Sequence, residues 1–169
     1  MDKKIKRLWK KTEEEGIEVR YSDLHSADPG LDGLYLCLDD LPIILLDKSL
    51  ESKRQLFRCV FAEEVGHYFT AAKSNFLVLH PSYAEDLRLS QDEYRAMCWA
   101  TEYLIPDKEL IYAIQTDGIN SFFDLADYFD VTQSFLMHKF SILKRRNKHN
   151  IEISDIFNLD VISYKISKS

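Results

Sequence analysis

The sequence lacks both a long apolar run and an excess of positive charge. Its longest apolar stretches, such as Leu41 to Leu46, are far too short to span a bilayer, and we predict no membrane span. The basic start is followed by Leu8-Trp9 and then by further charges, without the apolar core of a signal peptide, so we expect a cytoplasmic protein. The formal net charge of −6 argues against a surface that tracks nucleic acid throughout.

Cysteine is also scarce. The chain has three cysteines, Cys37, Cys59 and Cys98, an odd number without CxxC spacing. This pattern gives no disulfide framework and suits a reducing compartment. We interpret the three as small, buried apolar side chains.

What is present is the composition of a globular protein. The 169 residues are 46% hydrophobic and 30% charged, which is enough for one domain with its own core. We predict a single domain, with the main body over about 1–118, a helical appendage over about 119–150 and a tail over 151–169.

Apolar periodicity predicts an α+β fold: a small antiparallel sheet with a mainly helical body and C-terminal helices. The predicted elements are a helix at 2–15, strands at 17–21, 33–38 and 42–46, and helices at about 51–73, 90–104, from 106 onward, 121–129 and 132–144. Gly16 ends the first helix, Ser90 is the predicted N-cap of the second long helix, and Pro106 follows its end. The tail at 151–166 alternates loosely, which favours a further strand.

A group of possible metal ligands stands on the first long helix. Positions i and i+4 of a helix share a face, so Glu63 and His67 can point at one ion while Glu64 projects beside it. A catalytic Zn²⁺ needs three protein ligands and one open position, and Glu93 on the next helix is the best third candidate. Gly66 costs the helix about 1 kcal/mol relative to alanine, which suggests that a close approach is needed there.

The residues around these positions resemble the ImmA/IrrE family of metallopeptidases, which occur on phages and mobile elements. The resemblance rests on FAEEVGHYF at 61–69, EYRAMCWATEYLIP at 93–106 and DLADYFDVT at 124–132, and it spans roughly residues 30 to 145. It implies a zincin-like body that binds Zn²⁺ through Glu63, His67 and Glu93, with Glu64 as the general base. The implied function is that of an endopeptidase that cleaves a protein substrate, a helix-turn-helix transcriptional repressor of the same phage or mobile element, and thereby relieves repression.

Two positions depart from the family's usual pattern. The metal helix usually reads HExxH, whereas this chain has EExxH, with Glu63 in place of the first histidine. Two carboxylate ligands carry −2 and neutralise Zn²⁺, which makes the metal a weaker Lewis acid and favours slow or selective catalysis. Met97 stands where the family often has Asn or Asp, so His67 needs a hydrogen-bonding partner from elsewhere.

The sequence identifies no residue that would stabilise an oxyanion. Three residues are conceivable donors to an oxyanion, and we interpret each of them as a packing or surface side chain: Tyr68, Tyr94 and His80. Three more histidines lack the spacing of ligands and are interpreted as surface residues: His25, His138 and His149.

The C-terminal helices also fit a rival function. Residues 125–139 have the spacing of a helix-turn-helix, and the basic run at 144–148 follows, as in a DNA-binding regulator. Asp130, however, occupies the turn position that commonly holds glycine, the second helix offers little positive charge, and the chain is acidic, so we do not expect direct nucleic-acid binding. We prefer helices that pack beside the peptidase core and help to position a protein substrate. A third hypothesis is an inactive member that acts as a binding or antitoxin-like module.

Overall fold

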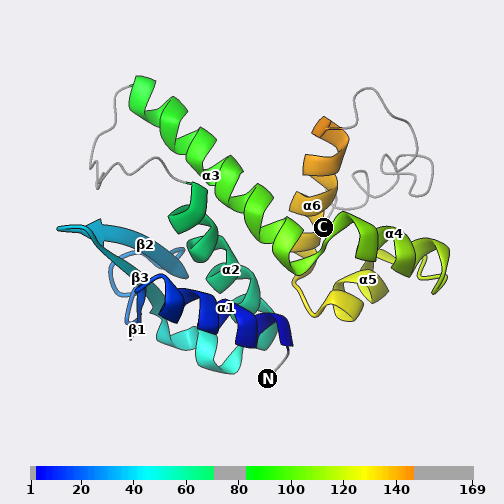
Figure 1. The fold of residues 1–169 in the computed structure, drawn as a ribbon, viewed down its shortest axis with the longest axis horizontal. Coiled ribbons are helices and arrows are strands. Elements are labelled where there is room, and N and C mark those ends of the chain that lie inside the picture. The colour runs from blue at the N-terminus through cyan, green and yellow to red at the C-terminus, as the bar shows by residue number, and fades with distance from the viewer. Residues whose placement is uncertain (1–2, 71–82, 147–169) are drawn as a thin grey trace.

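The fold is α+β, as predicted from the sequence (Figure 1). The computed structural model describes residues 3–70 and 83–146, which form a three-stranded sheet, a short 3-10 helix and six α-helices. In chain order the elements are α1 (Lys3–Glu14), β1 (Glu18–Ser22), β2 (Gly33–Leu38), β3 (Leu41–Asp47), the 3-10 helix η1 (Lys48–Ser52), α2 (Arg54–Thr70), α3 (Tyr83–Leu104), α4 (Asp107–Gln115), α5 (Phe122–Phe129) and α6 (Gln133–Arg146). None of these helices is long and apolar enough to cross a membrane. The strand predicted at 151–166 lies outside the described residues.

The sheet is mixed, and the prediction of a fully antiparallel sheet is wrong. The strand order is β1-β3-β2, with β2 antiparallel to β3 and β1 parallel to β3. The β2–β3 hairpin forms as expected, and Asp39 and Asp40 both have positive φ in its two-residue turn. Because β3 carries the fully buried Ile44 and Leu46, it takes the centre of the sheet, and β1 pairs with its other edge.

Helix α2 is the centre of the molecule. It packs against the sheet on one side and against α3 on another, and α1 crosses it. Phe61, Ala62 and Val65 in its middle are completely buried, and they join the side chains of β3 and α3 in one apolar core. A helix buried on several sides is a rigid support, so side chains that project from α2 are held in fixed positions.

The two long helices, α2 and α3, begin at residues other than those predicted from the sequence, which were about 51 and 90. Helix α2 begins at Arg54 because Lys53, which ends the 3-10 helix before it, has non-helical dihedrals, with φ of −114° and ψ of 73°. Asp47 caps the start of that 3-10 helix by accepting a hydrogen bond from the Ser49 amide at 2.8 Å. Helix α3 begins at Tyr83, so the prediction of Ser90 as its N-cap is wrong. Serine inside a helix costs only about half a kcal/mol, and the good helix formers before it allow the helix to continue. The caps at Gly16 and Ser121 occur where the sequence placed the helix ends.

The last two helices, α5 and α6, which we term the α5–α6 pair, are joined to the body by buried cations. Lys139 of α6 is 1% exposed, donates to Glu102 of α3 at 2.7 Å and pairs with Asp107 of α4. Arg58 of α2 is also buried and pairs with Asp130 at 3.3 Å. Asp130 ends α5 in the left-handed conformation, with φ of 53°. The turn between the two helices is therefore fixed against α2.

Candidate metal centre

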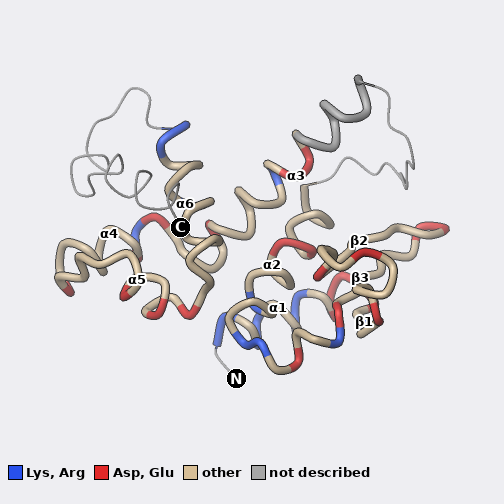
Figure 2. The backbone as a smooth tube through the Cα atoms, turned by 180° about the vertical axis from the view of Figure 1, so that it is seen from behind, with Lys and Arg blue, Asp and Glu red and all other residues tan. Residues whose placement is uncertain are grey.

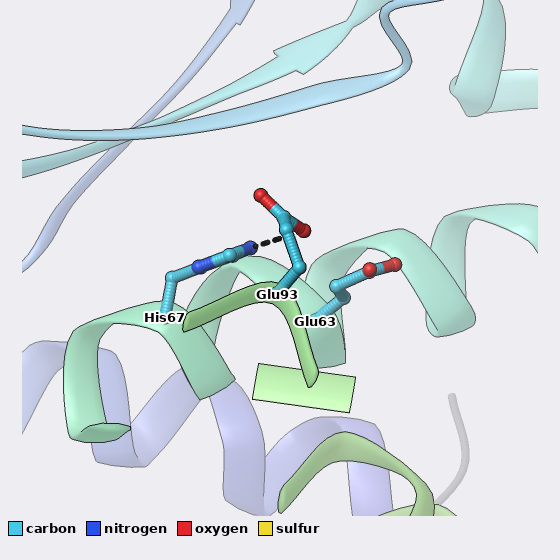
Figure 3. Close-up of side chains that lie close together, drawn as sticks. All are labelled: Glu63, His67 and Glu93. Atoms are coloured by element: carbon cyan, nitrogen blue, oxygen red, sulfur yellow. Dashed lines mark ion pairs between the residues drawn. The ribbon is translucent and has the colours of Figure 1, made fainter. Parts of the chain in front are cut away.

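Two helices bring together the three residues that the sequence singled out as ligands (Figure 3). Glu63 and His67 lie one turn apart on α2, and Glu93 reaches the same place from α3. One ligand atom from each of the three lies within 4.8 Å of the others, and His67 Nε2 is 3.3 Å from Glu93 Oε2. The side chains thus converge on a space of the size that one metal ion requires.

Gly66 permits this convergence. A Cβ atom at this position would lie 2.6 Å from the main-chain carbonyl oxygen of Ala96, a contact that backbone cannot relieve without moving. Ala96 is itself completely buried. The glycine therefore lets α3 approach α2 closely enough for Glu93 to reach His67, which is the close approach that the sequence suggested.

Glu64 lies beside the three residues and faces the sheet. The residue is 8% exposed, and the nearby main-chain amide of Tyr35 in β2 acts to lower the pKa of its carboxyl group. A Cβ on Gly33 would lie 2.7 Å from Glu64 Oε1 and 2.5 Å from Val60, so a side chain there would displace this carboxylate. Strand β2 thus positions Glu64 from above while α2 supports it from below.

The pKa values of the two carboxyl groups on α2 are raised. Burial raises the pKa of Glu63 to about 7, with the charge of Glu93 adding to the effect and that of His67 opposing it. Burial likewise raises the pKa of Glu64 to about 8, with Glu63 and Glu93 adding to the effect. Both groups are thus held in surroundings where negative charge is poorly compensated.

The other two groups stabilise each other as an ion pair. Burial acts to lower the pKa of His67, but the hydrogen bond to Glu93 and the charges of the three carboxylates outweigh it and raise this pKa. The same hydrogen bond lowers the pKa of Glu93. The imidazole is therefore the only partial compensation for three carboxylates within the cluster.

The cluster fits a divalent cation on chemical grounds. Its donor set of two carboxylates and one imidazole is one that Zn²⁺ accepts. A cation held between Glu63, His67 and Glu93 would supply positive charge that offsets the cost of burying the carboxylates, the main cause of their raised pKa values. Among the described residues, these three form the group with ligand spacing.

The cluster lies in a groove of about 1330 Å³. Strand β2 forms one wall, α2 forms the floor, and α3 together with the start of α6 forms the other side. Apolar side chains of several elements line it as well: Leu34, Leu36, Leu56, Val60, Met97 and Phe135. This volume exceeds that of an ordinary small-molecule pocket and is large enough for a polypeptide segment.

The start of α6 is the part of the groove that sequence reasoning missed. Thr132, Ser134 and His138 line it; His138 is exposed, as interpreted from the sequence, and it also borders the groove. No ligand spacing links His138 to residues 63–67, because a separate helix brings it to the groove. Tyr68 also lines the groove, where it donates a hydrogen bond to Glu15 at 2.9 Å. His80 and His149 lie outside the described residues.

Side chains that can bind a metal, brought together from two helices with a further carboxylate beside them in a groove, are typical of metallopeptidases whose site is carried on helices. The family model of the IrrE N-terminal-like domain, peptidase family M78, matches residues 12–141. The chain therefore belongs to this metallopeptidase family. None of the curated proteins and none of the solved structures matches the chain significantly.

Proposed function

We propose that the protein is a zinc-dependent endopeptidase that hydrolyses a peptide bond in a protein substrate. The observation that carries the proposal is the convergence of Glu63, His67 and Glu93 within 4.8 Å at the floor of a groove, with Glu64 beside them. Membership of a metallopeptidase family supports the same chemistry. The three converging residues would hold the metal, and Glu64 would remain free to act.

Zinc bound there would supply a Lewis acid that polarises the scissile carbonyl and lowers the pKa of a water molecule. Glu64 acts as the general base: it takes the proton of the attacking water and passes it to the leaving amine. Strand β2 leaves room for the Glu64 carboxylate at Gly33. Its pKa of about 8 refers to surroundings without a cation, and a divalent charge nearby would lower that value into the range of a base that works at neutral pH.

The ligand set itself bears on the rate. Glu63 in place of a histidine gives the three ligands a formal charge of −2, which matches and neutralises Zn²⁺. We expect slower hydrolysis than a two-histidine site would give, because a metal held by two carboxylates would be a weaker Lewis acid. A slow enzyme suits the cleavage of one regulatory protein better than general digestion.

The proposed substrate is a helix-turn-helix repressor of a phage or mobile element. Support comes from the family, and from a groove that is long enough for a peptide segment. The α5–α6 pair fits a role in holding that substrate. Phe135, Leu136 and Phe140 bury one face of α6 against the body, and the start of the helix lines the groove. A helix used in this way is poorly placed to enter a major groove of DNA.

The test is cleavage that depends on Glu64. The zinc-loaded protein and its Glu64→Gln variant are incubated with peptides derived from a bacterial proteome, and new termini are identified by mass spectrometry. We expect cleavages with the wild type that disappear in the variant and on treatment with a chelator, since glutamine keeps the shape of the residue but cannot accept the proton. Equal products from both proteins would rule out the proposed base, and no products from either would favour an inactive, protein-binding member of the family.

A further inference from the structure

One edge of β2 is open along the whole length of the groove wall. Strand β2 lies at the end of the order β1-β3-β2, and no described residue forms a strand beyond it. The amide of Asp47 donates to the Asp32 carbonyl at 2.8 Å, so Asp32 and the alternate residues after it bond to β3. The main-chain groups of Gly33, Tyr35 and Cys37 therefore face the open edge.

The open edge passes directly over the candidate metal centre. One of its amides, that of Tyr35, lies close enough to Glu64 to favour the charged form of this carboxyl group. The remaining groups of Gly33, Tyr35 and Cys37 are available to an extended chain that adds to the sheet as a further strand. A peptide in that position would run along the groove with its backbone next to the proposed base.

The groove is strongly acidic. Among the described residues that line it, no lysine or arginine occurs, whereas the acidic ones are Glu15, Asp32, Asp40, Glu63, Glu64, Asp92 and Glu93. Figure 2 shows this acidic character at the tip of the β2–β3 hairpin and along the middle of α2. The basic residues of α1 and of the end of α6 do not line the groove. Two of them lie at its margin: Lys11 is 4.7 Å from the ring centre of Phe69, and Arg145 is 5.2 Å from that of Tyr94.

A bound metal would leave much of this charge in place. Zn²⁺ would offset Glu63 and Glu93 but not the acids along the walls. Asp92 pairs with Arg95 at 3.1 Å and Asp32 with His25 at 3.0 Å, whereas Asp40 is exposed at the hairpin turn. Asp40 thus keeps a negative charge that an approaching peptide would meet, and the paired Asp32 and Asp92 contribute less to the potential.

We infer that the groove selects an extended peptide segment rich in lysine or arginine, bound along the open edge of β2. This inference rests on the proposed function, which places cleavage at the candidate metal centre. It adds the class of peptide segment that the groove binds. Main-chain hydrogen bonds to the edge give binding, and the acidic walls give the preference for basic side chains.

Binding is measured apart from cleavage, with the zinc-loaded Glu64→Gln full chain and short fluorescein-labelled peptides. Three peptides share the same leucine positions and carry lysine, serine or glutamate between them. We expect fluorescence anisotropy to show roughly tenfold tighter binding of the lysine peptide than of the serine peptide, and weaker binding still of the glutamate peptide. Added salt should reduce the difference.

Two double variants distinguish the effect of charge in the groove from the effect of the protein's net charge. Asp40→Asn with Asp92→Asn neutralises one acid on each wall, and asparagine tolerates the positive φ of position 40. Glu13→Gln with Asp124→Asn changes the net charge equally at exposed positions that do not line the groove. We expect the first pair to reduce the preference for lysine roughly threefold or more, and the second to leave it unchanged. Equal effects of both pairs, or equal binding of all three peptides, would overturn the inference.

The strand geometry has its own test. Lysine peptides are methylated on alternate main-chain nitrogens, in one of two registers. A peptide that adds to β2 presents only one set of amides to the strand, so we expect one register to weaken binding roughly tenfold and the other to leave it unchanged. Equal effects of both registers would contradict binding along the edge.

The inference and the proposed function can fail separately. A preference for lysine peptides without any cleavage would support this inference and contradict the proposed function. Cleavage without a preference for basic peptides would support the proposed function and contradict this inference.

Discussion

Two regions of the molecule are held together by different kinds of contact. The α2–α3 pair meets through close apolar packing, with Gly66 against the backbone of Ala96. The α5–α6 pair also packs on the body through apolar side chains such as Leu136. It differs in that two buried cations, Lys139 and Arg58, join it to the body as well, each paired with carboxylates from another element. The comparison teaches that the metal centre depends on the distance between two helices, whereas the last wall of the groove depends on charges that can be exchanged for apolar groups.

The largest effect on stability is expected from a substitution at the contact between α2 and α3. Gly66→Ala should lower the free energy of unfolding by about 2 kcal/mol, although alanine ordinarily stabilises a helix by about 1 kcal/mol, because its Cβ would collide with the Ala96 carbonyl. Denaturant unfolding measures the loss, and a competition assay should show weaker zinc binding. Gly30→Ala, whose Cβ would meet only ordinary contacts, is the control and should change stability by less than about 0.5 kcal/mol.

A substitution at Lys139 tests the other region. Lys139→Ala should cost about 2 kcal/mol, since it removes a buried stem and leaves Glu102 and Asp107 without their partner. Lys139→Met keeps the stem and should cost about 1 kcal/mol or less, because both carboxylates are partly exposed and can be hydrated. Exposed Lys108→Ala is the control. Zinc binding should stay unchanged in all three proteins, and a loss of zinc in Lys139→Met would contradict the separation of the two regions.

A smaller effect is expected from pH, and it belongs to the metal centre alone. The folded-state pKa values of Glu63, Glu64 and His67 are raised, so the stability that their bound protons contribute is present at low pH and lost as pH rises through those values. The metal-free protein should therefore unfold at a lower temperature at about pH 8 than at about pH 5.5. Calorimetry measures the difference, which added zinc should shrink or reverse. The lowered pKa of Glu93 acts the other way only below its ordinary range.

Much of the α2–α3 pair could be predicted because its signals are local. The i, i+4 spacing of Glu63 and His67 specifies one helix face, and Gly66 inside a helix marks a close contact. The start of α3 could not be predicted from Ser90, since a local capping preference gives way when the preceding residues also favour helix. The third candidate ligand, Glu93, could be proposed because the helix after α2 carries it, and the structure places it 3.3 Å from His67.

The sheet order and the α5–α6 pair depend on contacts distant in sequence. Alternating apolar residues predict a strand but not its neighbour, so the parallel pairing of β1 with β3 could not be derived. Lys139 has the polarity of a surface residue, and only acids 37 residues earlier, at Glu102, and on α4 explain its burial. Asp130 could be recognised as unusual at its turn, but its partner Arg58 stands on α2, 72 positions earlier.

The most direct test of the central claim is the metal content of the untagged protein, measured by mass spectrometry after purification. The account predicts near one zinc per chain in the wild type and in Glu64→Gln, because Glu64 lies beside the ligands without being one of them. It predicts loss of the metal in His67→Ala and Glu93→Ala. No bound metal in the wild type even after zinc is added, or equal metal content in all four proteins, would contradict a site built from Glu63, His67 and Glu93.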